Sequence, residues 1–99
     1  MLLKVKKGKR AVWEAWCKVL NDRKGEALET LKEEDLVQER CLLFGEGDES
    51  YVLYMHKAVE GKIKLPSRKE REMNRVHFEK FHECLERIPK EVVGYDFSL

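Results

Sequence analysis

The spacing of apolar and polar positions changes along the chain, and each change predicts a different element. Residues Leu2–Lys6 alternate and are typical of a short strand. After Gly8 the apolar positions recur at the three-to-four spacing of a helix: Val12, Trp13, Trp16, Val19 and Leu20. A kink or break is expected over residues 21–25, and helical spacing resumes at residues 27–31.

From Leu36 the apolar period becomes that of strands. Two strand segments, Val37–Phe44 and Tyr51–Lys57, flank the sequence GEGDES. The glycines and acidic residues of GEGDES are typical of a hairpin turn. The sequence therefore predicts a β-hairpin in the middle of the chain.

A second main helix is predicted after a loop at residues 58–69. Ser67 is its expected N-cap and Pro89 its expected end. One face of this helix carries Met73, Val76, His77, Phe81, Cys84, Leu85 and Ile88. The last predicted strand is Val92–Phe97.

The predicted element order is βαββαβ, in one domain over residues 1–99. This order indicates an α+β fold of ferredoxin-like type, in which two helices cover one face of a four-stranded antiparallel sheet with strand order 4-1-3-2. The other face of the sheet then has no cover. In a chain of this length we expect a second copy to close that face, so a homodimer is predicted.

The register of the hairpin decides which side chains share a face. If Gly45 pairs with Ser50, one nearly apolar face carries the pairs Phe44–Tyr51, Leu42–Leu53 and Arg40–Met55. We expect this face to lie under the helices. The uncovered face would then carry the pairs Leu43–Val52, Cys41–Tyr54 and Glu39–His56.

The polar residues Glu39, Tyr54 and His56 form a candidate site for a small polar ligand, with His77 as a further candidate. A carboxylate beside an imidazole can act as a general acid–base pair. A cross-strand ion pair is the simpler interpretation of Glu39 and His56, and we favour it. His77 lies on an apolar helical face, so a half-buried histidine with one hydrogen-bond partner is expected, although its ring can still reach a cavity.

Two functions remain open for this face of the sheet. It can bind a small molecule, as a cofactor-free enzyme or a simple binding protein, or it can be packed by a partner subunit in a structural or interaction module. No cofactor is predicted. No metal site is predicted either, because His77 and His82 are five residues apart and fall on different sides of a helix. Cys41 has no assured base beside it, so nucleophilic catalysis is not predicted.

Composition excludes several classes of function. The 20 Lys and Arg residues balance 19 Asp and Glu residues, so the chain lacks the basic excess of a nucleic-acid-binding or acidic-membrane-binding protein. No apolar segment approaches the length that spans a membrane. The cysteines are odd in number and widely spaced, which predicts no disulfide framework and indicates the reducing cytoplasm. They are Cys17, Cys41 and Cys84.

Three stretches of the chain, EALETLKEEDLVQERCLLF, YVLYM and HFEKFHECL, resemble a group of small bacterial and archaeal proteins known as a domain of unknown function. The resemblance covers residues 26–88, and the group carries a Glu, a His and a Cys where Glu39, His77 and Cys84 stand. It implies a ferredoxin-like fold of the dimeric α+β-barrel kind and no particular activity. The layout is more distantly similar to sugar mutarotases, but their His and Tyr in the first helical region have no counterpart here.

Overall fold

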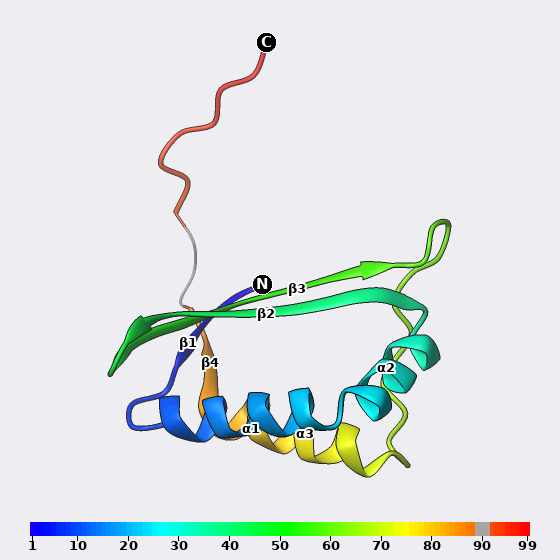
Figure 1. Cartoon of the computed structure of the whole chain (residues 1–99). Helices are drawn as coiled ribbons and strands as arrows, with labels where there is room; N and C mark the ends of the chain where they lie inside the picture. Colours follow the sequence, from blue (N-terminus) through cyan, green and yellow to red (C-terminus); the bar gives the residue numbers. More distant parts are fainter. Residues whose placement is uncertain (89–91) are drawn as a thin grey trace.

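The computed structural model describes residues 1–88 and 92–99, and in it a layer of helices lies against one face of a four-stranded sheet (Figure 1). The elements are β1 (Leu2–Val5), α1 (Arg10–Asp22), α2 (Lys24–Glu33), β2 (Leu36–Glu46), β3 (Glu49–Ala58), α3 (Glu72–Cys84) and β4 (Leu85–Arg87). The strands lie in the order β2-β3-β1-β4, and each neighbouring pair is antiparallel. The predicted α+β class and the four-stranded antiparallel sheet are confirmed.

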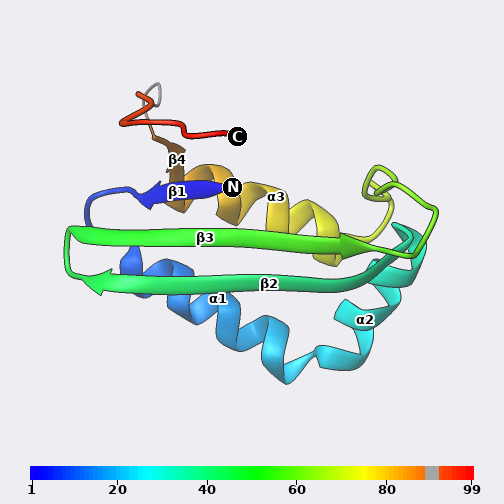
Figure 2. The same ribbon diagram turned by 90° about the horizontal axis from the view of Figure 1, so that it is seen from above.

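The hairpin of β2 and β3 is the longest feature of the sheet (Figure 2). The shorter strands β1 and β4 lie beside one part of it, and α1 and α3 pack together beneath it. The helix α2 lies under the opposite end, where β2 begins. None of the helices in the described ranges has the length and apolarity needed to cross a bilayer.

The break expected over residues 21–25 separates two helices. Arg23 ends α1, and its backbone N–H donates to the Val19 carbonyl at 2.9 Å. The helix α2 then starts at Lys24. The described part of the chain therefore contains three helices on the covered face, and the prediction of two was wrong.

The predicted register of the hairpin is confirmed, because Gly45 pairs with Ser50. The prediction of which face is covered was wrong. Val52 has no exposed surface and lies under the helices, whereas Phe44 is 45% exposed on the open face. The strand β1 explains the difference: Leu3 pairs with Val52, and both side chains belong to the buried core.

The helix α3 begins later and ends earlier than its apolar pattern predicts. The Ser67 hydroxyl donates to the Glu34 carboxylate at 3.1 Å and does not cap the helix. Arg71 precedes the first helical residue, and its guanidinium donates three hydrogen bonds to the two carboxylate oxygens of Glu33. The loop is therefore tied to the end of α2 before α3 starts. The predicted helix end at Pro89 lies outside the described residues.

The last strand was placed wrongly. The strand β4 follows α3 directly and pairs with β1, with Leu85 opposite Val5 and Arg87 opposite Leu3. Residues 92–99 form no strand and extend away from the sheet on the side opposite the helices (Figure 1). Their large apolar side chains are strongly exposed: Val92, Val93, Tyr95, Phe97 and Leu99.

The hydrophobic core lies where β1 and the middle of the hairpin face α1 and α3. Its buried side chains are Leu3, Val5, Trp13, Trp16, Val52, Met73, Cys84 and Leu85. Trp13 is 1% exposed and packs edge-to-face against Phe81, with ring centroids 6.4 Å apart. Burial of large aromatic and aliphatic side chains supplies most of the stabilisation of so small a domain. The core therefore fixes α1 and α3 under the part of the hairpin that pairs with β1.

Candidate functional site

A cleft of about 1080 Å³ lies between the sheet and the helices. The predicted candidates Glu39, Tyr54, His56 and His77 all line it. The first three were expected on the uncovered face of the sheet. The helices cover the face that was predicted to be open, so these three residues lie on the helix side, where His77 of α3 also lines the cleft. Whether these residues bind a ligand stays a prediction.

His77 is held by two hydrogen bonds, where one was expected. The Trp16 Nε1–H donates to Nδ1 of His77 at 2.9 Å, and Nε2 of His77 lies 2.8 Å from the Tyr54 hydroxyl. An indole nitrogen can only donate, so Nδ1 must be unprotonated. Burial lowers the pKa of His77 and favours the neutral ring. The single ring proton is therefore on Nε2, and it is donated to the oxygen of Tyr54.

Tyr54 consequently accepts a hydrogen bond from His77 and keeps its own proton free for another partner. Burial and the negative charge of Glu39 raise the pKa of the phenol, so the hydroxyl stays protonated. Glu39 lies near enough to Tyr54 for each group to affect the pKa of the other, and the nearby hydroxyl favours the carboxylate form of Glu39. The hydrogen bonds thus run from Trp16 through His77 to Tyr54, beside Glu39.

Glu39 lines the cleft beside the Tyr54 end of this chain of hydrogen bonds. The residue as a whole is exposed, but its carboxyl lies beside protein groups that remove part of its hydration. This burial, followed by the nearby charge of Glu34, raises the pKa of Glu39. Within the described ranges Glu39 forms no ion pair. A carboxylate in this setting can accept a proton or bind a hydrogen-bond donor.

Glu39 and His56 lie directly opposite each other on β2 and β3, as predicted. The structure gives no hydrogen bond or ion pair between them among residues 1–88 and 92–99. The favoured interpretation, a cross-strand ion pair, is therefore not supported. Glu39 interacts with Tyr54, and His56 remains an exposed residue at the rim of the cleft.

A second acidic residue lies in the cleft, and sequence reasoning missed it. Glu34 follows α2 and is 6% exposed. Its carboxylate pairs with Lys64 at 2.9 Å and accepts the hydrogen bond from Ser67 at 3.1 Å. Its charge is therefore compensated, in contrast to that of Glu39. In the sequence, the acidic residues Glu33–Asp35 indicated only the end of a helix. No pattern in the sequence predicted that Glu34 would contact a loop that lies 30 residues later.

Part of the remaining wall is apolar, and its apolar residues include Leu20, Ala27, Leu31, Met73 and Phe81. Polar side chains from the helices and β4 line the cleft as well, among them Asn21, Lys24, Thr30, Asn74 and Arg87. The cleft therefore offers both apolar surface and polar groups. A cavity with these two parts suits a ligand that has an apolar body and one polar group.

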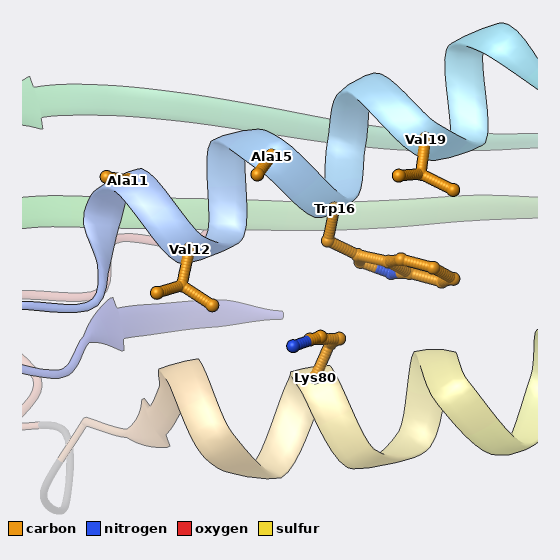
Figure 3. Close-up of a pocket in the computed structure, with 6 residues that line it drawn as sticks. All are labelled: Ala11, Val12, Ala15, Trp16, Val19 and Lys80. Carbon is orange, nitrogen blue, oxygen red and sulfur yellow. The ribbon is translucent and has the colours of Figure 1, made fainter.

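A second hollow lies on the outer surface of the helix layer, between α1 and α3 (Figure 3). It measures about 410 Å³ and is lined by Ala11, Val12, Ala15, Trp16, Val19 and Lys80. Lys80 supplies its one charged group, and the remaining lining is almost wholly apolar. The hollow offers little beyond apolar contact, so the cleft under the sheet is the better candidate site.

The described part of the chain contains no cluster of three or more side chains suited to hold a metal ion. The prediction that there is no metal site remains a prediction.

Comparison with curated proteins and with solved structures found no match. The resemblance to sugar mutarotases therefore has no support. A family model does match, and it covers residues 1–95, which is nearly the whole chain. It describes a family of unknown function, in agreement with the resemblance found in the sequence. The chain belongs to this family of unknown function, DUF6176.

Proposed function

We propose that this protein binds a small molecule in the cleft between its sheet and its helices. The observation that carries the proposal is the directed chain of hydrogen bonds from Trp16 through His77 to Tyr54, which ends beside Glu39. Core stability does not require this arrangement, because a polar network inside a small domain costs desolvation energy. Such networks hold a polar group in a fixed orientation toward a ligand.

The polar part of the ligand is a hydrogen-bond donor or a cation. Glu39 offers a carboxylate that has no ion-pair partner among the described residues, whereas Glu34 beside it is already paired with Lys64. The apolar part of the ligand packs against side chains such as Leu31 and Phe81. The preferred ligand class is therefore a small amine or alcohol with an aromatic or aliphatic body.

Cofactor-free proton transfer is a second candidate function for the same cleft. The raised pKa of Glu39 brings this carboxyl closer to the pH at which it can take up and return a proton. Tyr54 can stabilise an oxygen that gains negative charge, because its proton is free to be donated. This chemistry would act on a ligand of the class proposed above.

We further propose that the fold is ferredoxin-like and that the protein is a homodimer in the cytoplasm. The strand order, read from the β4 edge as 4-1-3-2, supports this topology. The uncovered sheet face presents Leu2, Phe44 and Met55, each at least 40% exposed, and such a face favours a second copy. The half-buried and buried free thiols are compatible with a reducing compartment.

A thermal-shift screen of the whole protein tests the binding proposal. The probes are primary amines and alcohols that carry a phenyl, indole or branched aliphatic body, and short-chain carboxylic acids with the same bodies serve as the comparison set. A ligand that binds only the folded state at 100 times its Kd adds about 2.7 kcal/mol of stability. Amines or alcohols should raise the midpoint temperature of thermal unfolding, and the matching carboxylic acids should not. A screen in which no amine or alcohol shifts the midpoint would overturn the proposal.

A further inference from the structure

Residues 62–67 form a strap without helix or strand at one side of the cleft. The strap lies between β3 and α3 and passes α2 (Figure 1). Two of its side chains, Lys64 and Ser67, line the cleft. Its apolar residues do not join the hydrophobic core of the described chain, and Ile63 and Leu65 are 80% and 42% exposed. Apolar packing therefore contributes little to the position of the strap.

The chain is anchored on both sides of the strap. Before it, the backbone N–H of Val59 donates to the Asp35 carbonyl at 2.8 Å. After it, the guanidinium of Arg71 donates to the carboxylate of Glu33, with the shortest bond at 2.9 Å. Both anchors lie outside residues 62–67. The strap can therefore separate from α2 while the two anchors stay in place.

Glu34 holds the strap itself, through its side chain and its backbone. The carboxylate lies 2.9 Å from the Lys64 ammonium and accepts a hydrogen bond from the Ser67 hydroxyl at 3.1 Å. The backbone N–H of Leu65 donates to the Glu34 carbonyl at 2.9 Å. The side chain of Glu34 is 7% exposed and that of Lys64 is 32% exposed. Water and salt can therefore reach the ion pair from the Lys64 side.

The position of Lys64 also sets the charge in the cleft. Glu34 and Glu39 both line the cleft, and their charges act on each other. Glu34 raises the pKa of Glu39, and Lys64 lowers it. When Lys64 moves away with the strap, Glu34 loses its ion-pair partner and the surroundings of Glu39 become more negative.

We propose that the strap opens and closes one side of the cleft, and that its contacts with Glu34 hold it closed. In the open form Lys64 and Ser67 leave the wall, and Glu34 becomes a second free carboxylate near Glu39. The open form therefore attracts an incoming amine more strongly than the closed form does. This regulation rests on the proposed binding function, but the opening itself is measured without a ligand. A screen that finds no ligand would overturn the binding function and would leave the measured opening intact.

Amide hydrogen exchange of the whole wild-type protein, followed by NMR at a fixed pH, tests the opening. The N–H of Leu65 loses its acceptor when the strap opens, whereas the N–H of Val59 stays bonded to Asp35. Raising sodium chloride from about 0.05 M to about 0.5 M screens the ion pair of Lys64. Exchange at Leu65 should become about threefold faster relative to exchange at Val59. An equal response of the two amides would overturn the proposal.

Two variants test the role of the ion pair. Lys64→Met removes the ammonium and keeps an unbranched side chain, and exchange at Leu65 should become about fivefold faster than in the wild type. Lys62→Met makes the same change in the same strap at a residue that does not line the cleft, and it should leave this rate unchanged. Unchanged exchange at Leu65 in Lys64→Met would show that the ion pair does not hold the strap.

The pKa of Glu39, measured by carbon-13 NMR of its carboxyl carbon, links the strap to the cleft. Lys64→Met should raise this pKa above the wild-type value, because the lowering effect of Lys64 is lost and the raising effect of Glu34 remains. Lys62→Met should leave it unchanged. A Glu39 pKa that is the same in the wild type and in Lys64→Met would contradict control of the cleft by the strap.

Discussion

The indole Nε1 of Trp16 lies 2.9 Å from Nδ1 of His77, and this contact fixes the direction of the hydrogen bonds that follow it. Because the indole can only donate, the proton of His77 is on Nε2 and is directed at Tyr54. The helices α1 and α3 thereby orient a side chain of the sheet. Nitrogen-15 NMR of His77 should show an unprotonated Nδ1 and a protonated Nε2 at neutral pH.

Because the ring of His77 is neutral in the folded protein, the free energy of unfolding should depend on pH. Burial lowers the pKa of His77 below its ordinary value of 6.5, so the unfolded chain takes up this proton at a higher pH than the folded chain. The contribution of neutral His77 to the free energy of unfolding is therefore fully present above pH 6.5, and it is lost as the pH falls through the pKa of His77 in the folded protein. The expected slope is up to about 1.4 kcal/mol per pH unit between the two pKa values.

Urea unfolding of wild type and two variants at a series of pH values measures this slope. His77→Gln should remove the part of the slope that His77 supplies. His82→Gln changes an exposed histidine on the same helix and should leave the slope unchanged. Equal slopes in the wild type and in His77→Gln would show that His77 does not carry the effect.

Tyr54→Phe is expected to destabilise the protein. On an uncovered face the loss of this hydroxyl would cost less than about 1 kcal/mol. In the structure it leaves the Nε2–H of His77 without an acceptor, and a buried unpaired donor costs about 1 to 3 kcal/mol. Tyr51→Phe is the matched control on the same strand, and its effect should be close to zero. The free energy of unfolding of both variants, measured in urea, decides between these expectations.

Glu39→Gln should not destabilise the protein at neutral pH. The folded pKa of Glu39 is raised above its ordinary value of 4.5, so its stabilising contribution is present below pH 4.5 and is lost as the pH rises through the folded pKa. Removing the charge should therefore leave stability at pH 7 unchanged or increase it by less than about 1 kcal/mol. A loss of about 3 to 5 kcal/mol would mean that Glu39 is half of a buried ion pair.

The sequence predicted the hairpin and its register but could not predict which face the helices cover. Both faces of this hairpin are largely apolar, so alternation alone does not distinguish them. The deciding contact is long-range, because Leu3 of β1 pairs with Val52 and places it in the core. Once that face is fixed, Tyr54 must point at α3.

The last strand was missed because its first residue continues the apolar spacing of α3. Leu85 follows Cys84 on the predicted helical face, and nothing in the local sequence ends the helix there. Pairing with β1 overrides the helical preference. The segment Val92–Phe97 has the stronger strand composition, but it lies outside the sheet. The hydrogen bond between Trp16 and His77 could not be predicted from the local sequence either, because the two residues are 61 positions apart.

The exposed apolar tail gives a test of the proposed dimer. Tyr95 and Phe97 are 81% and 88% exposed. They belong to the C-terminal segment 92–99, which extends on the side of the sheet that no helix covers (Figure 1). We expect them to pack against a second copy, so light scattering at tens of micromolar should give the mass of a dimer. The double variant Tyr95→Ser, Phe97→Ser should shift the mass toward the monomer. A wild-type monomer at that concentration would contradict the proposed assembly.

Calorimetric titration with the best ligand from the amine and alcohol screen tests the central claim, that the cleft binds its ligand through Glu39. Glu39→Gln should raise Kd at least about tenfold, the effect of losing one charged hydrogen bond of about 1.4 kcal/mol or more. Glu46→Gln makes the same chemical change on the same strand but outside the cleft, and it should leave Kd unchanged. An equal Kd for the wild type and Glu39→Gln would contradict the claim.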